Sequence, residues 1–272
     1  MSSRYLFDRL ELVEELLACS RVGLFSDFDG TLVPIVADPA EAALPPSSQE
    51  MLRLLTARLD LVALISGRSV QDLRQMAGVE GIIYIGNHGL ERWVRGRAET
   101  LEEAVPFGPS IQQVIEAVHG LSLPGLVLED KGETLSIHYR GVRDTSRARA
   151  TILDLVSEVA RSLGLRVSEG KMVIEVRPPL EMNKGLALES LVSEYSLTGV
   201  LMLGDDLTDV DAFRAVHRLV AQKRVKGLAI AVTDAETPEP VFAEADLILD
   251  GVADSERFLK WLAEARDLTA GS

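Results

Sequence analysis

The chain has 272 residues, of which 47% are hydrophobic and 26% are charged, a balance typical of a folded globular protein and not of a disordered one. Its 42 acidic residues outnumber its 28 lysines and arginines, which gives a formal net charge of −14 at pH 7. Because no basic run offsets this charge, we expect no nucleic acid and no anionic membrane as partner. An anionic substrate would have to be small and held by a local cation or a metal ion.

The chain contains a single cysteine, Cys19, so neither an intramolecular disulfide bond nor a thiolate metal cluster is expected. The N-terminal segment carries acidic residues and lacks the apolar core of a signal peptide. No apolar stretch approaches the ~20 residues that span a bilayer. We therefore expect a cytoplasmic protein; the sequence leaves the oligomeric state open and is compatible with a monomer.

Hydrophobic periodicity predicts alternating helices and strands in the first and last parts of the chain. Apolar residues from Leu6 to Leu17 recur at helical spacing, and Val22–Phe25 has the apolar composition of a buried parallel strand. Further strands are expected at 61–65, 82–85, 200–203 and 228–232, and further helices at 47–59, 69–77, 186–195, 208–219 and 253–267. This alternation predicts an α/β fold, a parallel sheet with helices on both faces.

The middle of the chain has a different pattern, in which a helix is followed by two strands and the order then repeats. The segments are 110–119, 125–129, 134–139, 145–163, 165–168 and 172–176. Short turns separate the strands of each pair, as in hairpins. We therefore expect an inserted α+β domain (αββαββ) at residues 105–183, within a parallel-sheet domain made of residues 1–104 and 184–272.

Four clusters of polar residues are expected at the carboxyl ends of the strands of this parallel sheet. In open α/β sheets, this edge is where ligands bind. Together they offer carboxylates, a hydroxyl and an ammonium, the groups that phosphoryl transfer requires. The clusters are Asp27-Phe28-Asp29-Gly30-Thr31, Ser66-Gly67-Arg68, Asn183-Lys184-Gly185 and Gly204-Asp205-Asp206-Leu207-Thr208-Asp209.

Each cluster taken alone has a simpler interpretation. The first is also compatible with an Asp/Gly turn, whereas a calcium loop fits less well because the glycine comes too early and a strand precedes it. Ser66 can cap the next helix, a role compatible with anion binding there. Lys184 by itself resembles a surface residue. The carboxylates after Gly204 repel one another unless a cation or a helix start offsets them.

In this order, the four clusters resemble the motifs of the haloacid dehalogenase (HAD) superfamily of aspartyl phosphatases. The resemblance implies a Rossmann-like HAD core in which Asp27 is the nucleophile and forms an aspartyl phosphate. Asp29 would then act as general acid and afterwards as general base. It also implies that Ser66 and Lys184 bind the phosphoryl oxygens.

The same resemblance implies Mg²⁺ as cofactor. The Asp27 carboxylate, the backbone carbonyl of Asp29 and the Asp205 carboxylate would hold the ion. Asp206 and Asp209 are expected to bind the metal directly or to support its ligands, and the sequence does not separate these two roles.

Further residues and short segments extend the resemblance to the trehalose-6-phosphate phosphatase family. They are Gly86–Glu91, Glu129, Lys131, Ser136, His138–Arg140, Gly170-Lys171, Glu175–Pro178 and Gly204–Phe213. The resemblance implies that the inserted domain is a specificity cap whose Glu129, Lys131 and Glu175 hydrogen-bond disaccharide hydroxyls, with Asn87 and His88 also near the substrate. Val210 departs from the family, which usually has an acidic residue there.

The expected function is Mg²⁺-dependent hydrolysis of trehalose 6-phosphate, a small sugar phosphate, in trehalose biosynthesis. One alternative is another sugar-phosphate phosphatase, acting on sucrose phosphate or mannosyl-phosphoglycerate. A second is a non-catalytic sugar-phosphate sensor, although such a module has no need of Asp29. Without a substrate role, Glu129 and Lys131 would be a solvated hairpin pair, Glu175 an exposed strand residue and His88 a loop histidine.

Overall fold

The computed structural model describes residues 4–36, 41–94, 96–170 and 172–269. Lys171, which belongs to one of the family-like segments named above, lies outside the described residues. The chain divides into two compact units. The core unit comprises residues 1–99 and 182–272, and the inserted unit comprises residues 100–181. Among the described helices, none combines the length and apolar character required to cross a bilayer.

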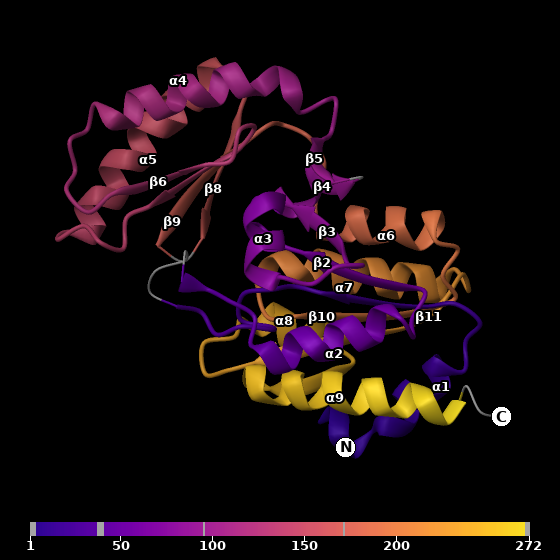
Figure 1. Cartoon of the computed structure of the whole chain (residues 1–272). Helices are drawn as coiled ribbons and strands as arrows, with labels where there is room; N and C mark the ends of the chain where they lie inside the picture. Colours follow the sequence, from indigo (N-terminus) through magenta and orange to yellow (C-terminus); the bar gives the residue numbers. More distant parts are fainter. Residues whose placement is uncertain (1–3, 37–40, 95, 171, 270–272) are drawn as a thin grey trace. The chain divides into compact units, whose positions relative to one another are not determined.

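The core unit is built on a mostly parallel sheet (Figure 1). Its strand order over the described residues is β12-β11-β10-β1-β2-β3-β4-β5. Neighbours from β12 to β3 are parallel, and β4 is antiparallel to β3. The strands are β1 Val22–Ser26, β2 Leu61–Ile65, β3 Ile83–Gly86, β4 Glu91–Val94, β5 Arg97–Thr100, β10 Gly199–Gly204, β11 Lys226–Thr233 and β12 Leu247–Asp250.

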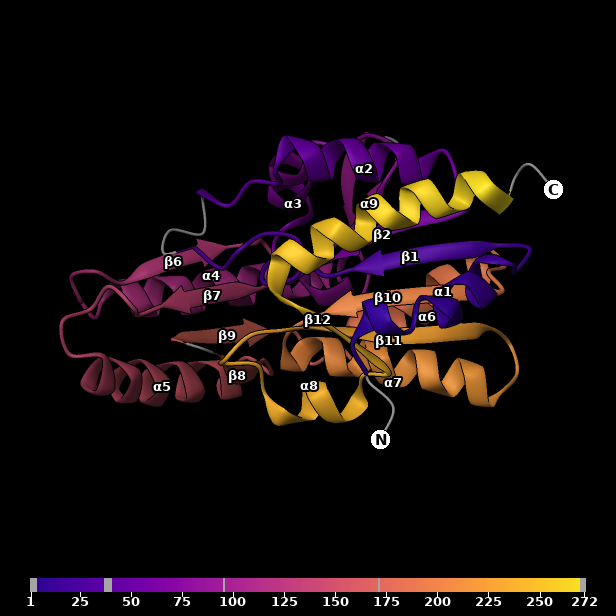
Figure 2. The same ribbon diagram turned by 90° about the horizontal axis from the view of Figure 1, so that it is seen from below.

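Helices cover both faces of this sheet, and Figure 2 shows α2 and α9 on one side of the strands with α7 and α8 on the other. Apolar residues of α1, α2, α3 and α9 pack on the first face, and those of α6, α7 and α8 on the second. The helices are α1 Leu10–Leu17, α2 Pro46–Thr56, α3 Val70–Ala77, α6 Lys184–Glu194, α7 Leu207–Ala221, α8 Glu239–Glu244 and α9 Gly251–Thr269. The predicted α/β fold, a parallel sheet covered on both faces, is confirmed.

The N-terminal segment corrects one prediction. Leu6–Leu17 is not a single helix but a 3₁₀ turn, η1 (Leu6–Asp8), followed by α1. Arg9 separates them because its backbone, with φ −137° and ψ 32°, is not helical. Leu6 is nevertheless fully buried, so its apolar spacing reflects packing against the core and not a continuous helix.

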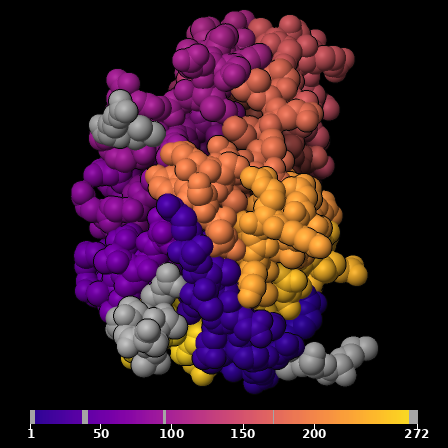
Figure 3. Space-filling model, turned by 90° about the vertical axis from the view of Figure 1, so that its right-hand side faces the viewer, coloured from indigo at the N-terminus to yellow at the C-terminus, as the bar shows by residue number. Residues whose placement is uncertain are grey.

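The N-terminal segment is also anchored to the last elements of the chain. The Tyr5 hydroxyl donates to Asp254 Oδ2 at 2.8 Å, and the Ile248 N–H donates to the carbonyl of Arg4 at 2.8 Å. Figure 3 shows the indigo N-terminal atoms beside yellow C-terminal ones. These contacts hold the start of the chain against β12 and α9.

The inserted unit has the predicted helix–strand–strand order, repeated once. Its antiparallel sheet has the strand order β6-β7-β9-β8 in the described residues, and fully buried Ile137 and Ile174 contribute to the core shared with the helices. Its described elements are one short 3₁₀ helix, Val105–Phe107, and then α4 Gly108–His119, β6 Val127–Asp130, β7 Leu135–His138, α5 Thr145–Ser162, β8 Arg166–Gly170 and β9 Val173–Arg177. The predicted α+β character of the insertion is therefore confirmed.

Replacing Leu201 by Ala should test the central packing of the core unit. Leu201 lies on β10 and is 0% exposed, so the substitution should lower the free energy of unfolding by about 2–5 kcal/mol. Leu207→Ala is a matched control because Leu207 is 53% exposed, and it should change stability by no more than about 0.5 kcal/mol. Urea unfolding measures both, and equal losses would contradict the buried position of Leu201.

Candidate active site

The candidate site lies at the carboxyl ends of the central strands of the core unit. Strand β1 pairs with β10 on one side and with β2 on the other, and Ser26 lies opposite Leu203 and Leu64. The segments that follow these strands therefore leave the sheet side by side. The parallel topology thus brings Asp27, Ser66 and Asp205 to the same edge.

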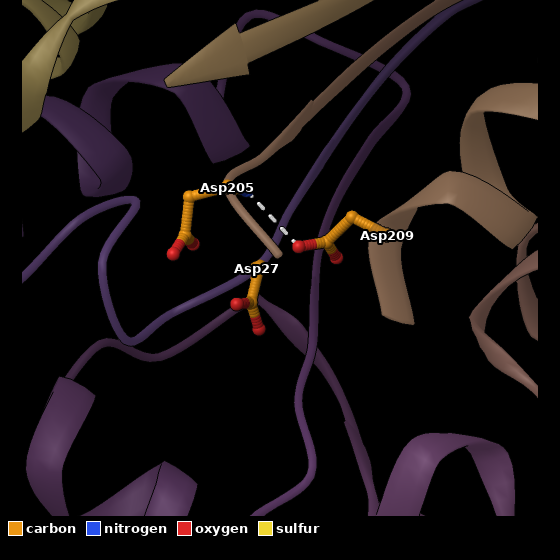
Figure 4. Close-up of side chains that lie close together, drawn as sticks. All are labelled: Asp27, Asp205 and Asp209. Carbon is orange, nitrogen blue, oxygen red and sulfur yellow. Dashed lines mark hydrogen bonds between the residues drawn. The ribbon is translucent and has the colours of Figure 1, made fainter. Parts of the chain in front are cut away.

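Three carboxylates meet at this edge (Figure 4). Asp27 follows β1, Asp205 follows β10, and Asp209 lies in the first turn of α7. One carboxylate oxygen from each lies within 4.8 Å of the others. Asp27 and Asp209 are buried and Asp205 is partly buried, so water screens their mutual repulsion only weakly.

Lys184 places a buried ammonium among these carboxylates. Its Nζ atom donates to Asp27 Oδ1 at 2.8 Å and to Asp209 Oδ1 at 2.7 Å. Lys184 is the first residue of α6, and the Asn183 side chain caps that helix by accepting from the Leu186 N–H at 2.9 Å. A Cβ at Gly185 would lie 2.4 Å from the Asp211 carbonyl oxygen, so this approach of α6 to α7 requires glycine.

The pKa values follow from burial and from this shared ammonium. Burial raises the pKa of Asp27 well above its usual range; Lys184 opposes the rise, whereas Asp209 and Asp205 add to it. Burial and the charge of Asp209 raise the pKa of Asp205 to about 7. Burial alone would lower the pKa of Lys184, but Asp209 and Asp27 outweigh it and raise that pKa. Lys184 is therefore an ammonium at neutral pH.

This donor set fits a divalent metal ion. A bound divalent cation would favour the ionised form of all three carboxylates, and their three negative charges against one ammonium would leave two for the cation to balance. Carboxylate oxygens are also the ligands that hard divalent cations prefer. Asp27 and Asp205 are the best placed to bind it.

Asp209 is suited to a supporting role. Its Oδ1 accepts from Lys184, and its Oδ2 accepts from the backbone N–H groups of Asp205 and Asp206 at 3.0 and 3.1 Å. These bonds occupy most of the roughly four acceptor sites of a carboxylate. Asp206 is exposed at the N-cap of α7 and lies outside the cluster of three carboxylates.

The loop after β1 orients Asp205. The Thr31 hydroxyl donates to Asp205 Oδ1 at 2.7 Å. Gly30 has φ +82°, and a Cβ there would lie 2.1 Å from Asp205 Oδ2. Glycine is therefore required both by the left-handed backbone and by the close carboxylate. The sequence showed Gly30 and Thr31 in the first motif but not these contacts.

Asp29 directs its carboxylate to Arg68. Arg68 Nε donates to Asp29 Oδ2 at 2.6 Å, and Arg68 Nη2 donates to Asp29 Oδ1 at 2.7 Å. This is a bidentate ion pair, which fixes both charge and orientation. Sequence reasoning missed the contribution of Arg68, although Arg68 directly follows Ser66 and Gly67.

The loop after β2 and the loop after β3 are bonded to each other. Ser66 is buried, its hydroxyl accepts from the Arg68 N–H at 3.2 Å, and its carbonyl accepts from the His88 N–H at 2.9 Å. A Cβ at Gly67 would lie 2.5 Å from His88 Nε2, so glycine allows the imidazole to lie against this loop. The structure thus places His88 beside the Ser66 loop.

Asn87 is buried, and its side chain is directed to a second buried residue. The Asn87 amide donates to Glu91 Oε1 at 2.7 Å, while Glu91 Oε2 accepts from the Val70 N–H at 2.7 Å. Glu91 therefore joins the loop after β3 to the start of α3. Sequence reasoning quoted Glu91 in a motif but assigned it no role.

The predicted sugar-binding residues belong to the inserted unit, where Ser136 links them. Lys131 Nζ donates to the buried Ser136 hydroxyl at 2.9 Å, and this hydroxyl donates to Glu175 Oε1 at 3.1 Å. Glu129 Oε2 lies 3.5 Å from Lys131 Nζ and 3.1 Å from His138 Nε2. Glu129, Ser136 and Glu175 are direct cross-strand neighbours, so they occupy one face of the sheet.

Comparison with known proteins shows the family to which the chain belongs. The fold is shared with a haloacid dehalogenase-like hydrolase from Bacteroides thetaiotaomicron, which matches with a TM-score of 0.64 and 16% identity, covering 92% of this chain and 100% of the other. The model of the trehalose-phosphatase family matches residues 25–245, and the chain belongs to this family. The resemblance expected from the motifs is therefore confirmed.

Individual relatives agree with this assignment. A probable trehalose-phosphate phosphatase from Oryza sativa subsp. japonica is 34% identical over 82% of this chain and 63% of its own length. A trehalose-phosphate phosphatase from Mycobacterium tuberculosis is 35% identical over 74% of this chain and 52% of its own length. The chain therefore spans less than two thirds of these relatives.

A solved structure shares the fold. The C-terminal domain of trehalose-6-phosphate phosphatase from C. albicans matches with a TM-score of 0.78 and 24% identity, covering 97% of this chain and 99% of the other.

A divalent cation should stabilise the folded chain, because it balances the buried carboxylates. At about 100 times its Kd, Mg²⁺ should raise the melting temperature by about 5–10 °C relative to protein in chelator. Asp205→Asn should remove most of this rise, whereas Asp206→Asn should keep it because Asp206 is exposed and Asn is also a good N-cap. The measurement is thermal melting at constant ionic strength, and an undiminished rise in Asp205→Asn would contradict the assignment.

Proposed function

We propose that the chain is a Mg²⁺-dependent phosphatase that hydrolyses trehalose 6-phosphate to trehalose and inorganic phosphate. The observation that carries the proposal is the buried Asp27 carboxylate, bonded to Lys184 and close to Asp205, in a member of the trehalose-phosphatase family. The names of the matched relatives describe the same reaction. A cytoplasmic location remains a prediction.

In the proposed first step, Asp27 attacks the phosphorus atom. A bond forms between a carboxylate oxygen and phosphorus, the ester bond to the sugar oxygen breaks, and Asp27 becomes an aspartyl phosphate. Lys184 fixes the Asp27 carboxylate and, with Ser66, binds phosphoryl oxygens. When bound by Asp27, Asp205 and the backbone carbonyl of Asp29, Mg²⁺ supplies positive charge that offsets the negative charge of the phosphoryl group.

Asp29 is the general acid and then the general base of the proposed mechanism. It gives a proton to the departing sugar oxygen and then takes one from the water that hydrolyses the aspartyl phosphate. Asp29 is suited to this because its side chain is 31% exposed, whereas that of Asp27 is 8% exposed. Asp209 holds Lys184 and the Asp205 loop in place and takes no part in bond making.

The polar face of the inserted unit is proposed to bind the sugar. Glu129 and Glu175 accept hydrogen bonds from hydroxyls, and Lys131 donates to them. Their links through Ser136 and His138 keep these side chains ordered before a ligand arrives, which lowers the entropy cost of binding. We place His88 near the substrate, beside Ser66. Asn87 supports its loop through Glu91.

Replacing Asp27 by Asn should abolish turnover of trehalose 6-phosphate, because an amide cannot act as the carboxylate nucleophile. We expect less than about a hundredth of the wild-type kcat. Asp234→Asn, in an exposed turn, is the control and should keep full activity. Phosphate release in the presence of Mg²⁺ measures both variants. An Asp27→Asn enzyme that keeps more than about a hundredth of the wild-type kcat would contradict the aspartyl-phosphate mechanism.

The same assay separates the alternative functions. A higher kcat/KM for sucrose phosphate or mannosyl-phosphoglycerate than for trehalose 6-phosphate would assign a different substrate. Binding of sugar phosphates without release of phosphate from any ester would identify a sensor and overturn the proposed function.

Replacing Glu129 or Glu175 by Ala should lower kcat/KM for trehalose 6-phosphate by roughly ten- to several-hundredfold, about 1.5–3 kcal/mol for a lost hydrogen bond to a charged group. A small aryl phosphate should be hydrolysed nearly as well as by wild type, because it has no sugar hydroxyls. Lys131→Ala should behave likewise. Equal losses on both esters would show that these residues support the fold and not recognition.

A further inference from the structure

We infer that Arg68 is a positioning residue for Asp29, holding the carboxylate in the orientation from which it exchanges protons with the leaving oxygen and with water. This inference rests on the proposed function and goes beyond it, because it assigns Arg68 to the proton-transfer steps, of which protonation of the leaving group can be tested by itself. The guanidinium acts through Asp29 and is not itself a proton donor, since arginine stays protonated in proteins.

The geometry of the pair is the first observation. Two parallel hydrogen bonds of 2.6 and 2.7 Å join the guanidinium to both oxygens of Asp29. A fork of this kind fixes the plane of the carboxylate, whereas a single bond would leave it free to rotate. The Arg68 side chain is 12% exposed and that of Asp29 is 31% exposed, so Asp29 is the member of the pair that remains open to water and ligands.

The backbone of Arg68 is fixed as well. Its carbonyl accepts from the Asn87 N–H at 2.8 Å, and its own N–H donates to the Ser66 hydroxyl at 3.2 Å. The next residue, Ser69, caps α3 by accepting from the Asp72 N–H at 3.1 Å. The guanidinium therefore extends from an ordered loop that also carries the proposed phosphate ligand Ser66.

The fork leaves Asp29 able to react. A carboxylate has about four acceptor sites, and Arg68 occupies one on each oxygen. One of the remaining positions can carry the proton that Asp29 donates to the leaving oxygen, and after that transfer the same position can accept from water.

This role predicts a dependence on the leaving group. Nitrophenolate departs readily without a proton, whereas the oxygen of unsubstituted phenyl phosphate needs protonation. Loss of a well-placed general acid should therefore slow the hydrolysis of phenyl phosphate more than the hydrolysis of p-nitrophenyl phosphate. kcat/KM is the proper measure, because it reports the steps up to departure of the leaving group.

The experiment compares wild type, Arg68→Ala, Asp29→Asn and the double variant on the two aryl esters with Mg²⁺. In Arg68→Ala, kcat/KM for phenyl phosphate should fall roughly ten- to hundredfold more than kcat/KM for p-nitrophenyl phosphate, part of the factor that a general acid supplies. The double variant should match Asp29→Asn, because Arg68 has no effect once the acid is absent.

Arg149→Ala is the matched control. Arg149 forms the same bidentate pair with Glu169, with distances of 2.6 and 2.9 Å, on the surface of the inserted unit. Its replacement by Ala should change kcat/KM for neither ester. Thermal melting verifies that each variant is folded. If Arg68→Ala fails to fold, Arg68→Lys replaces it, since lysine keeps the charge but cannot form the fork; it should show the same selective loss.

Two results would overturn the inference alone: equal losses on both esters, which would place Arg68 on the phosphoryl group or in the fold, or losses that multiply in the double variant. An inactive wild type on every ester would overturn the proposed function and this inference with it.

Discussion

A single buried ammonium, that of Lys184, makes the rest of the site possible. Removing carboxylates from water is costly unless an opposite charge and hydrogen bonds compensate them. Lys184 compensates Asp27 and Asp209 at once, and Asp209 in turn fixes the backbone of Asp205. Helix α6, the end of β1 and the start of α7 are thereby joined through one nitrogen atom. The remaining negative charge of the cluster is what makes it receptive to a divalent cation.

Much of the core unit was predictable because its parallel strands are buried on both faces and therefore consist of continuous apolar residues. The elements that sequence reasoning missed, β4, β5, α8 and β12, are short. The site motifs were predictable because polar residues directly follow buried strands. The bonds from Arg68 to Asp29, from Thr31 to Asp205 and from Asn87 to Glu91 depend on tertiary proximity and rotamer, which no local pattern encodes. Val210, the departure from the family pattern, is a buried member of the apolar core on the face of the sheet that α6, α7 and α8 cover.

Strand alternation separates the apolar face of the sheet in the inserted unit from its polar face. Residues such as Ile137 and Ile174 face the helices, whereas Ser136 and Glu175, their neighbours in sequence, face the other way. Packing and the proposed sugar binding can therefore vary independently, since a change on the polar face leaves the apolar contacts of the other face intact. The stiff sheet beneath also holds the polar side chains at fixed spacing.

The pairing of β1 with β10 has a consequence for the order in which the protein acquires its site. Val22 lies opposite Gly199, so the whole inserted unit is synthesised between two strands that end up adjacent. A ribosome-bound chain that stops before β10 presents β1 with one edge unpaired, and it lacks both Lys184's partner Asp209 and Asp205. Closing so long a loop is slow compared with forming local contacts. The candidate site is therefore assembled late, after most of the polypeptide has emerged, and chains truncated before β10 cannot form it.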